Sequence, residues 1–310
     1  MRKYIMKRIL WLIPIVLGVS ILVFTLMYVA PGDPAVIIMG PTATEKEYDI
    51  LREQLGLNRG YFVRLGEFLY NSFIKFDFGT SYLTKGAIVP EILARFPRTV
   101  LLAALCMMAS IIIGVPLGII AALKQNSIGD RLCMVFAFIG VSMPNFWLAL
   151  LLILLFSVKL NILPPMGFGG LQYYILPMMA ASMGGIAAQA RQSRSAMLEV
   201  IRSDYVTTAR SKGLSSIGVI LRHELPNTLI PVITIAGNRF GGMLGGVVVL
   251  EKIFGIPGIG AYLVDGVFNR DYPVVQACVI FLAVAFTLIM LCVDILFALV
   301  DPRIKAQYSK

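Results

Sequence analysis

Residues 9–30 of this sequence, ILWLIPIVLGVSILVFTLMYVA, decide the class of fold, because they run for 22 positions without a charged side chain. A helix crosses the hydrocarbon core of a bilayer with about 20 apolar residues. The stretch follows the basic start MRKYIMKR, as the core of a signal peptide would, but a cleavable signal has an apolar core of only about 7–15 residues. It also ends in APGDP (residues 30–34), which is a poor cleavage site. We therefore expect a retained first transmembrane helix.

The composition of the whole chain supports a membrane protein. Its 310 residues are 58% apolar and 14% charged, and the mean hydropathy is +0.83. A soluble domain carries about 25% charged residues, so too few charges remain here to cover a water-facing surface. The net charge of +10 would suggest a nucleic-acid partner for a soluble chain. In a membrane protein it indicates instead that basic loops gather on one face, so we expect no nucleic acid.

Five more apolar runs follow the first. Because backbone polar groups must be satisfied within the segment in lipid, all six runs are predicted to be helices. The fifth and sixth runs contain the only charges, Arg239 and Asp294. For the central Arg239 we weigh a place along a transport pathway against one in a subunit seam. For Asp294 we expect contact with the interface. The six predicted spans are residues 9–30, 99–123, 132–158, about 173–190, 225–250 and 274–300.

The distribution of basic residues predicts the orientation of the spans. If the N-terminus is cytoplasmic, the pieces on that side contain fifteen Lys and Arg, against three in the two short external loops. Cytoplasmic loops carry an excess of Lys and Arg, so we expect both termini in the cytoplasm. The four cytoplasmic pieces are then residues 1–8, 124–131, 191–224 and 301–310, and the short external loops are residues 159–172 and 251–273.

Residues 31–97 form the one sizeable segment expected outside. Residues 45–55 have the pattern of a short amphipathic helix, with Gly56 after it as a stop. Residues 61–74 have the pattern of a second helix, and the sequence at 79–81 marks a turn. We therefore expect a small external subdomain between an N-terminal unit, 1–30, and a transmembrane core, 98–300, with a cytoplasmic tail at 301–310.

The cytoplasmic loop 191–224 is the most informative segment for function. Ser203 or Asp204 suits the N-cap of a short helix, Lys212 suits the C-terminal dipole of that helix, and Gly213 suits a left-handed stop. Ser215 or Ser216 is placed to cap a second helix over residues 217–223. A stiff knob between two membrane helices can transmit force to a soluble partner. The alternative is an interfacial helix lying on anionic lipid. A helix face made of small residues is expected at Ala209, Ser211 and Gly213.

This loop resembles the EAA loop of ABC importer permeases, which has Glu-Ala-Ala, three residues, Gly, nine residues, Ile, one residue and Leu-Pro. Here Ala209, Gly213 and Leu225-Pro226 match at the family's spacing, whereas Thr207, Thr208 and His223 replace the Glu, the first Ala and the Ile. The sequence from Asp204 to Leu214 is similar to that of the dipeptide, oligopeptide and nickel branch of the family, in which the Glu is commonly lost.

Other segments resemble the same branch, in order along nearly the whole chain. Those from Gly140 to Trp147 and from Met166 to Gly170 are similar to nickel permeases, and others equally to peptide and glutathione permeases. The motifs are PGDP (31–34), DFGTS (77–81), SMPNFW (142–147), RDYPVVQ (270–276) and DPRI (301–304).

The resemblance implies an all-α integral membrane fold, the type I ABC importer permease fold, with six transmembrane helices and a small external helical insertion between the first two. It implies a subunit of a bacterial or archaeal cytoplasmic membrane that forms half of the path for peptides, glutathione or nickel chelates. Its partners would be a homologous second permease, two cytoplasmic ATPases, an external binding protein and membrane lipid. The resemblance places contact with the ATPase at Asp204, Tyr205, Thr207, Thr208, Ala209, Arg210, Lys212, Gly213, Leu214, Leu225 and Pro226.

We expect no catalysis and no cofactor on this chain, with ATP and Mg²⁺ on partner subunits. The sequence has no phosphate-binding loop, no nucleophile elbow and no zinc motif, and it holds a single histidine, His223. A metal site is not expected either. Candidate pathway residues are Arg239, Asn145 and Trp147. Glycines at 237, 241 and 245, and at 242 and 246, indicate either ordinary close helix packing or a pathway seam.

Two other classes of function remain open at this point. A stand-alone secondary transporter predicts inverted repeats, broken helices at the midplane and several buried carboxylates. A membrane-embedded enzyme predicts clustered His, Asp or Glu within the spans. The four cysteines lie in apolar runs and are expected to be small packing residues without disulfides.

Overall fold

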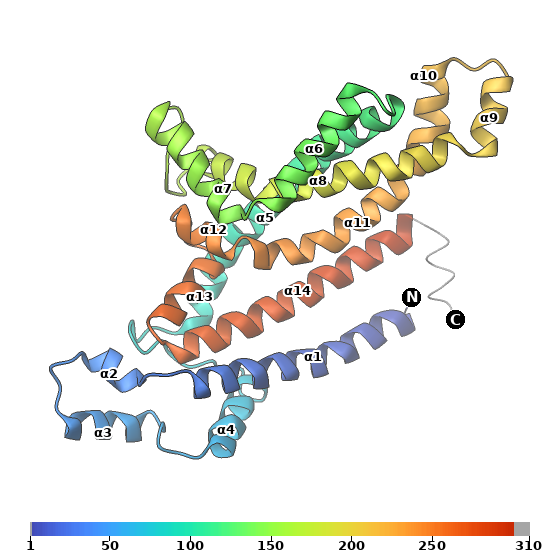
Figure 1. The fold of residues 1–310 in the computed structure, drawn as a ribbon. Coiled ribbons are helices and arrows are strands. Elements are labelled where there is room, and N and C mark those ends of the chain that lie inside the picture. The colour runs from blue at the N-terminus through green and yellow to red at the C-terminus, as the bar shows by residue number, and fades with distance from the viewer. Residues whose placement is uncertain (1, 301–310) are drawn as a thin grey trace. The chain divides into compact units, whose positions relative to one another are not determined.

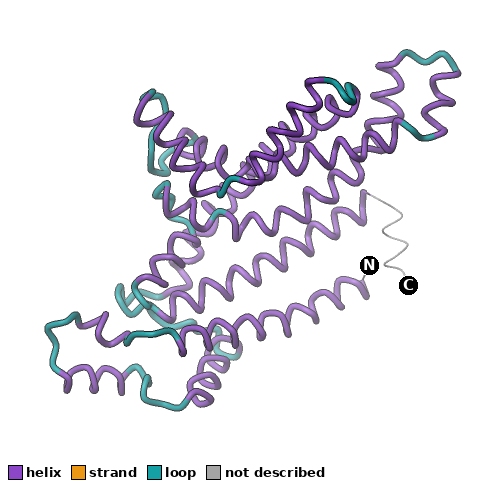
Figure 2. The backbone as a smooth tube through the Cα atoms, in the orientation of Figure 1, coloured by secondary structure: helices purple, strands orange, loops and turns teal. Residues whose placement is uncertain are grey.

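The computed structural model describes the backbone of residues 2–300, and the predicted tail 301–310, with its DPRI motif, lies outside the described residues. The chain forms two compact units, and each is described by itself. The first comprises Met1–Thr99 and Pro257–Leu288, and the second comprises Val100–Ile256 with the stretch from Ile289 onward. The secondary structure of the described residues is helical (Figures 1 and 2), and the one bridge between extended residues pairs Thr80 with Ala87.

The first unit contains two long helices and several short ones. Its apolar core gathers Ile88, Ile92, Ile259, Val274 and Cys278, all fully or nearly fully buried. α5 begins in this unit and continues into the second. The helices are α1 (Arg2–Val29), α2 (Pro34–Met39), α3 (Glu45–Gln54), α4 (Tyr61–Phe73), the start of α5 (Ile88–Leu123), α13 (Ile259–Phe268) and the start of α14 (Tyr272–Val300).

Short-range signals predicted two of the three helices that lie within segment 31–97. α3 and α4 match the predicted 45–55 and 61–74, and Gly56 adopts the left-handed conformation after α3. The Glu47 carboxylate accepts hydrogen bonds from the backbone N and the hydroxyl of Thr44, at 2.7 and 2.8 Å. This is a capping box, which satisfies donors at the start of the helix. That this segment lies outside the cell stays a prediction.

One helix in this segment was not predicted. α2 starts at Pro34, and the Asp33 carboxylate before it accepts a hydrogen bond from the backbone N of Ala35 at 2.9 Å. An N-cap Asp followed by Pro at the first helical position is a recognised start signal, so the sequence contained the information. The helix spans only six residues, which is too short for a periodic apolar pattern to show.

The second unit is built around α5 and α8. Residues from α5, α7, α8 and α12 form its main core, in which Leu102, Cys106, Leu176, Leu250 and Phe254 are each no more than 1% exposed. Its elements are the rest of α5, α6 (Ile128–Ser142), α7 (Asn145–Leu152), the π-helix η1 (Ile153–Lys159), α8 (Gln172–Ile201), α9 (Asp204–Ser211), α10 (Ser216–Val219), the π-helix η2 (Ile220–Glu224), α11 (Leu225–Gly246) and α12 (Val248–Ile253).

The prediction of one continuous helix over residues 132–158 is wrong. The chain bends by 103° between α6 and the following α7–η1 helix. The break lies at Met143 and Pro144, whose backbones are both extended, with ψ of 127° and 132°. A proline disfavours the helical conformation of the residue before it, which is the physical reason for the break. The SMPNFW motif therefore marks a corner.

Length and composition support fewer crossings than the six predicted. Among the described residues, three helices are long and apolar enough to cross a membrane, namely Ile9–Val29, Ile88–Leu123 and Tyr272–Val293. The number is four if α6 and the bent α7–η1 helix count as one span. α8 and α11, which cover the fourth and fifth predicted spans, are not among them. α8 also continues eleven residues past the predicted end of its span, to Ile201. The count of six stays a prediction, and the side chain of Asp294 lies outside the described residues.

The four cysteines are all free, as expected. Cys106 and Cys278 are buried packing residues. Cys133 is half-buried and Cys292 is exposed, so the packing role predicted for all four holds for the first two only.

Candidate functional site

The segment between α8 and α11 folds as two short helices joined by a tight turn. α9 starts after the N-cap Ser203 and is followed by Lys212 and by Gly213, which has φ +81°. The hydroxyl of Ser215 then accepts a hydrogen bond from the backbone N of Gly218 at 3.3 Å and caps α10. Figure 2 shows the turn as the loop between these two helices. Ser203 occupies the N-cap position of α9, but its hydroxyl donates to the carbonyl of Val200 at 2.6 Å and does not cap the helix. The predicted cap at Ser215 and the glycine stop are confirmed.

No break separates this second helix from the membrane core. α10 continues through η2 directly into α11 at Leu225. A continuous helical backbone therefore connects the short helices to α11. We call residues 203–224 the α9–η2 segment.

A small apolar cluster holds α9 against α10. Val206 and Val219 are fully buried, Ala209 is 6% exposed, and Val200 at the end of α8 packs against them. Ala209 therefore faces the inside of the segment, whereas Ser211 and Gly213 are exposed. The predicted small face joining these three residues is wrong, because positions two apart on a helix point to different sides.

An ion pair joins α9 to η2 within the α9–η2 segment. The guanidinium of Arg210 donates to Glu224 Oε1 at 2.9 Å, and the Glu224 side chain is fully buried while that of Arg210 is half-exposed. The other oxygen, Oε2, has no hydrogen-bond partner among the described residues. A buried carboxylate is costly unless it is paired, so this contact fixes α9 to the start of α11. Sequence reasoning missed Glu224, because nothing local indicates that a residue fourteen positions away will pair with it.

The outer surface of the segment is apolar with polar flanks. Ile217 is 70% exposed and Leu221 is 58% exposed, four positions apart on one helix, and Leu214 and Tyr205 are also exposed. Sequence reasoning missed Ile217 and Leu221, although their spacing was a signal for a shared face. Among the other predicted contact residues, Asp204, Thr207, Thr208, Lys212 and Pro226 are exposed and Leu225 is half-buried.

A second ion pair stiffens the same end of the unit. Asp130, at the start of α6, is almost fully buried and accepts two hydrogen bonds from the Arg194 guanidinium on α8, at 2.6 and 2.7 Å. Its carboxylate also accepts from the backbone N of Asn126 at 3.0 Å. Bidentate pairs of this kind set orientation as well as energy. The pair joins α6 to α8 a few residues before the α9–η2 segment begins.

A cavity of about 430 Å³ lies between α8, α11 and the corner before α7. Arg239 is the one charged residue among those that line it, and Asn145 lines it as well because the break at Pro144 places the start of α7 there. Gly242 and Gly246 line it from α11, at the spacing that puts them on the face of Arg239. Trp147 is not in the lining. Two of the three predicted pathway residues, Arg239 and Asn145, therefore line one cavity, and Trp147 does not.

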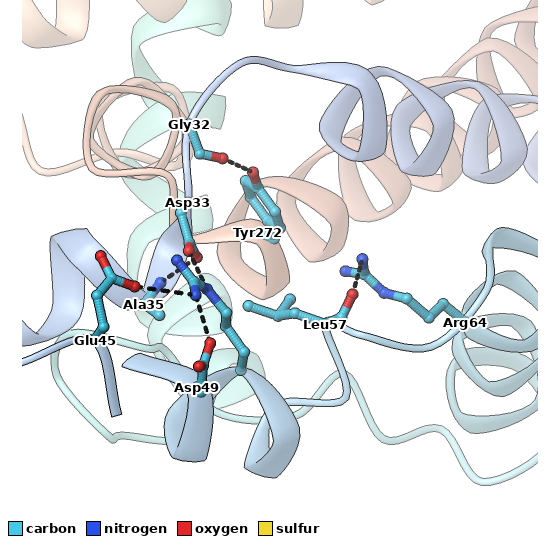
Figure 3. A network of polar contacts seen from close by, with 9 residues as sticks. Gly32, Asp33, Ala35, Glu45, Asp49, Leu57, Arg64 and Tyr272 are labelled. Carbon is cyan, nitrogen blue, oxygen red and sulfur yellow. Dashed lines mark hydrogen bonds and ion pairs between the residues drawn. The ribbon is translucent and has the colours of Figure 1, made fainter. Parts of the chain in front are cut away.

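In the first unit, three sequence motifs that are far apart along the chain come together. Asp271 is 3% exposed and accepts hydrogen bonds from the Ser81 hydroxyl at 2.5 Å and the Tyr82 backbone N at 3.1 Å. Burial raises the pKa of the Tyr82 phenol to about 12. The Tyr272 hydroxyl donates to the carbonyl of Gly32 at 3.5 Å (Figure 3). Hydrogen bonds thus join the motifs at 31–34, 77–81 and 270–276 into one cluster.

Comparisons with known proteins agree along nearly the whole chain. Residues 114–306 match the family model described as binding-protein-dependent transport system inner membrane component, and residues 1–103 match the model of its N-terminal domain. The glutathione transport system permease protein GsiC of Escherichia coli strain K12 is 42% identical over 305 residues, covering 98% of this chain and 99% of that protein. GsiC of Shigella dysenteriae serotype 1 is similar to the same extent.

A solved structure shares the fold. The crystal structure of an amino acid ABC transporter with histidines has a TM-score of 0.51 and 19% identity, and the match covers 69% of this chain and 94% of the other. At that identity the likeness concerns the fold alone.

Proposed function

This chain belongs to the binding-protein-dependent transport system inner membrane component family, and from that premise we propose how it works as a permease of an ABC importer. It is a multi-pass membrane protein without catalytic activity of its own, and ATP hydrolysis lies in separate subunits. The family implies ATPase and substrate-binding partners. We propose that the α9–η2 segment is the contact with one ATPase and that the cavity at Arg239 belongs to the translocation path.

The single observation that carries the coupling proposal is the construction of the α9–η2 segment. It combines a buried apolar cluster, the Arg210–Glu224 ion pair and an unbroken helical connection to α11. A segment held in this way moves as one body with α11. Its exposed apolar side chains, Leu214, Ile217 and Leu221, suit the cleft of a soluble partner better than water. Closure of the ATPases would then tilt α11, provided that the ATP-bound state binds one position of the segment more tightly.

The orientation and the partners follow from the same proposal. With the α9–η2 segment in the cytoplasm, both termini are cytoplasmic and α2, α3 and the start of α4 lie on the outer side, where the binding protein delivers its cargo. The membrane is the cytoplasmic membrane of a bacterium or archaeon. A homologous second permease would supply the other half of the path. The alternative of a stand-alone secondary transporter is not favoured by membership of this family.

We propose a carboxylate-bearing peptide as the cargo, with glutathione as the leading candidate. The relatives at 42% identity are named as glutathione permeases. Arg239 presents a permanent positive charge to a cavity otherwise lined by small, apolar and amide side chains. A fixed cation attracts a carboxylate and repels a bare metal cation, so a nickel ion would need to travel as an anionic chelate. Dipeptides and longer peptides carry the same carboxylate and remain alternatives.

The coupling proposal is tested with a matched pair of surface isoleucines. Ile217, in the α9–η2 segment, is 70% exposed, and Ile128, at the start of α6, is 77% exposed. We expect Ile217→Ser to reduce co-purification of the ATPase and ATP-driven uptake, while Ile128→Ser leaves both unchanged. If the two variants retain the ATPase equally well, the α9–η2 segment is not the contact.

The cargo proposal is tested by uptake assays on Arg239 variants. We expect Arg239→Gln to lose most uptake of labelled glutathione and Arg239→Lys to retain part of it, with Trp147→Phe, outside the cavity, as the control. Binding of glutathione, dipeptides, longer peptides and nickel chelates to the cognate binding protein would identify the cargo. Unchanged uptake and assembly in Arg239→Gln would remove Arg239 from the path.

A further inference from the structure

Two cavities of the first unit are lined by residues of the same pair of helices, α1 and α14. One, of about 220 Å³, is lined chiefly by Tyr28, Asp33, Arg52, Arg64 and Tyr272, and we call it the interfacial pocket. The other, of about 500 Å³, lies between α1, the end of α4, the start of α5 and α14, and we call it the apolar groove. Its lining is hydrocarbon except at Ser72. From these two cavities we infer a binding site for one membrane phospholipid, with the phosphodiester in the interfacial pocket and an acyl chain in the apolar groove.

The two cavities have the spacing of a lipid in one leaflet. Tyr28 is next to the end of the candidate span Ile9–Val29, and Tyr272 begins the candidate span Tyr272–Val293, so the interfacial pocket sits where both spans meet the membrane surface. The groove residues of α1, 12–17, come 11–16 positions before Tyr28, which is about 16–24 Å along the helix axis. Those of α14, 277–284, come about 8–18 Å after Tyr272. Half a bilayer with its headgroups is about 20–22 Å thick.

The charge of the interfacial pocket suits an anion. The Arg52 guanidinium pairs with three carboxylates shown in Figure 3, those of Asp33 at 2.5 Å, Asp49 at 2.7 Å and Glu45 at 3.8 Å. Arg64 has no carboxylate partner among the described residues. Its guanidinium lies 5.3 Å from the centre of the Tyr28 ring and donates a hydrogen bond to the carbonyl of Leu57, at 3.4 Å. It is therefore free to bind a phosphate oxygen, and basic pockets between membrane helices bind lipid headgroups in this way.

A second guanidinium, that of Arg270, packs against a residue that lines the interfacial pocket. Arg270 packs against Gly32, where a Cβ would lie 1.3 Å from its Nη1, and that nitrogen is buried with no hydrogen-bond partner among the residues that the structure describes. Gly32 lines the interfacial pocket. The charge of Arg270 is thus close enough to strengthen anion binding, although its buried nitrogen does not reach the ligand.

The groove contains an unexplained polar group. The hydroxyl of Ser72 is in a side chain only 2% exposed, lines the groove and has no partner among the described residues. Helical Ser and Thr usually donate to a carbonyl one turn earlier, as Ser20 and Thr25 do here. An unsatisfied buried hydroxyl is costly. The ester carbonyl at the head of an acyl chain is the acceptor that a membrane lipid would bring to it.

Native mass spectrometry of the full-length chain, purified alone and in its assembled transporter, tests the site with dipalmitoyl phosphatidylglycerol as the probe. Ile13 is 53% exposed and lines the groove, whereas Ile15 is 47% exposed and does not. We expect Ile13→Trp to fill the groove and weaken lipid retention about tenfold or more, with Ile15→Trp unchanged. Loss of one charged hydrogen bond predicts a similar loss for Arg64→Gln. Arg59→Gln, which breaks only the pair with Glu67, should retain the lipid.

Three results would overturn the proposal. The first is equal retention of the lipid by Ile13→Trp, Arg64→Gln and their controls. The second is displacement of the lipid by millimolar glycerol 3-phosphate, which would mean that the pocket recognises a free phosphate without using the groove. The third is retention by the isolated chain but not by the assembled transporter, which would show that a partner subunit covers the groove. Ser72→Ala, which removes the unsatisfied hydroxyl, should weaken retention of the lipid without lowering the thermal stability of the lipid-free chain.

Discussion

Substitution of Gly213 tests whether the turn of the α9–η2 segment is held by its backbone conformation. The residue has φ +81°, and an added Cβ would meet no atom within 4 Å. Gly213→Ala therefore carries no steric penalty from neighbours. It carries only the cost of placing a side chain in the left-handed region, about 1–2 kcal/mol. The lower conformational entropy of alanine in the unfolded chain offsets part of this, so we expect a net loss of about 1 kcal/mol, or about fivefold in the opening equilibrium of the segment.

The expected ranking separates this explanation from a contact at Gly213. Asparagine tolerates the left-handed conformation better than alanine, so Gly213→Asn should lose less than half as much as Gly213→Ala. Gly129→Ala is the control, because its φ is not positive and its nearest neighbour atom would be 3.7 Å away. Hydrogen exchange of the full chain in nanodiscs, read on peptides covering residues 204–216, measures the opening directly.

The refuting result is equally specific. If Gly213→Ala and Gly213→Asn both exchange at the wild-type rate, the left-handed turn does not hold the segment. If both exchange faster by the same factor, the cause is the bulk of a side chain, in conflict with the open space around the residue.

Three further predictions concern polar contacts. Arg210→Gln leaves the buried Glu224 carboxylate without its cation, whereas Glu224→Gln keeps a neutral partner, so thermal unfolding should show the larger loss for Arg210→Gln, about 1–3 kcal/mol; equal losses would contradict this. Arg194→Lys removes the bidentate grip on Asp130 and should cost about 1.5–3 kcal/mol by the same assay, and wild-type stability would show that the pair carries no net energy. The hydrogen bonds from the Thr44 backbone and hydroxyl hold the pKa of Glu47 below its ordinary value of about 4.3, so their stabilisation of α3 is complete above that pH and is lost as the pH falls through the lowered pKa. Hydrogen exchange in α3, corrected for intrinsic rates, should accelerate over that range, and Glu47→Gln should remove the dependence.

Local signals in the sequence predicted the short helices α3, α4, α9 and α10, but not α2 and α13. The start of α3, the stop of α9 and the cap of α10 depend on residues within three or four positions of one another, so Thr44, Gly213 and Ser215 were sufficient to indicate them. The corner at Pro144 was also encoded locally, but an unbroken apolar run hid it. Hydropathy averages over such a run and does not register one proline.

Pairings across the chain were beyond such reasoning. The ion pair of Arg194 with Asp130 joins residues 64 positions apart, and Asp271 meets Ser81 across 190 positions. Nothing in the sequence near either residue indicates its partner, since many charged and polar residues are available and packing selects among them. The inward position of Ala209 is of the same kind, because it depends on how α9 folds onto α10.

By itself, the sequence determined that this chain is a membrane protein and that a capped, glycine-ended knob precedes α11, because hydropathy and helix capping act over one helix or one turn. Only the tertiary structure decided that Arg239 and Asn145 share a cavity, that Trp147 stays outside it, and that two cavities align along α1 and α14. Those facts depend on the bend at Pro144 and on the packing of distant helices, where the geometry of the whole unit selects which side chains meet.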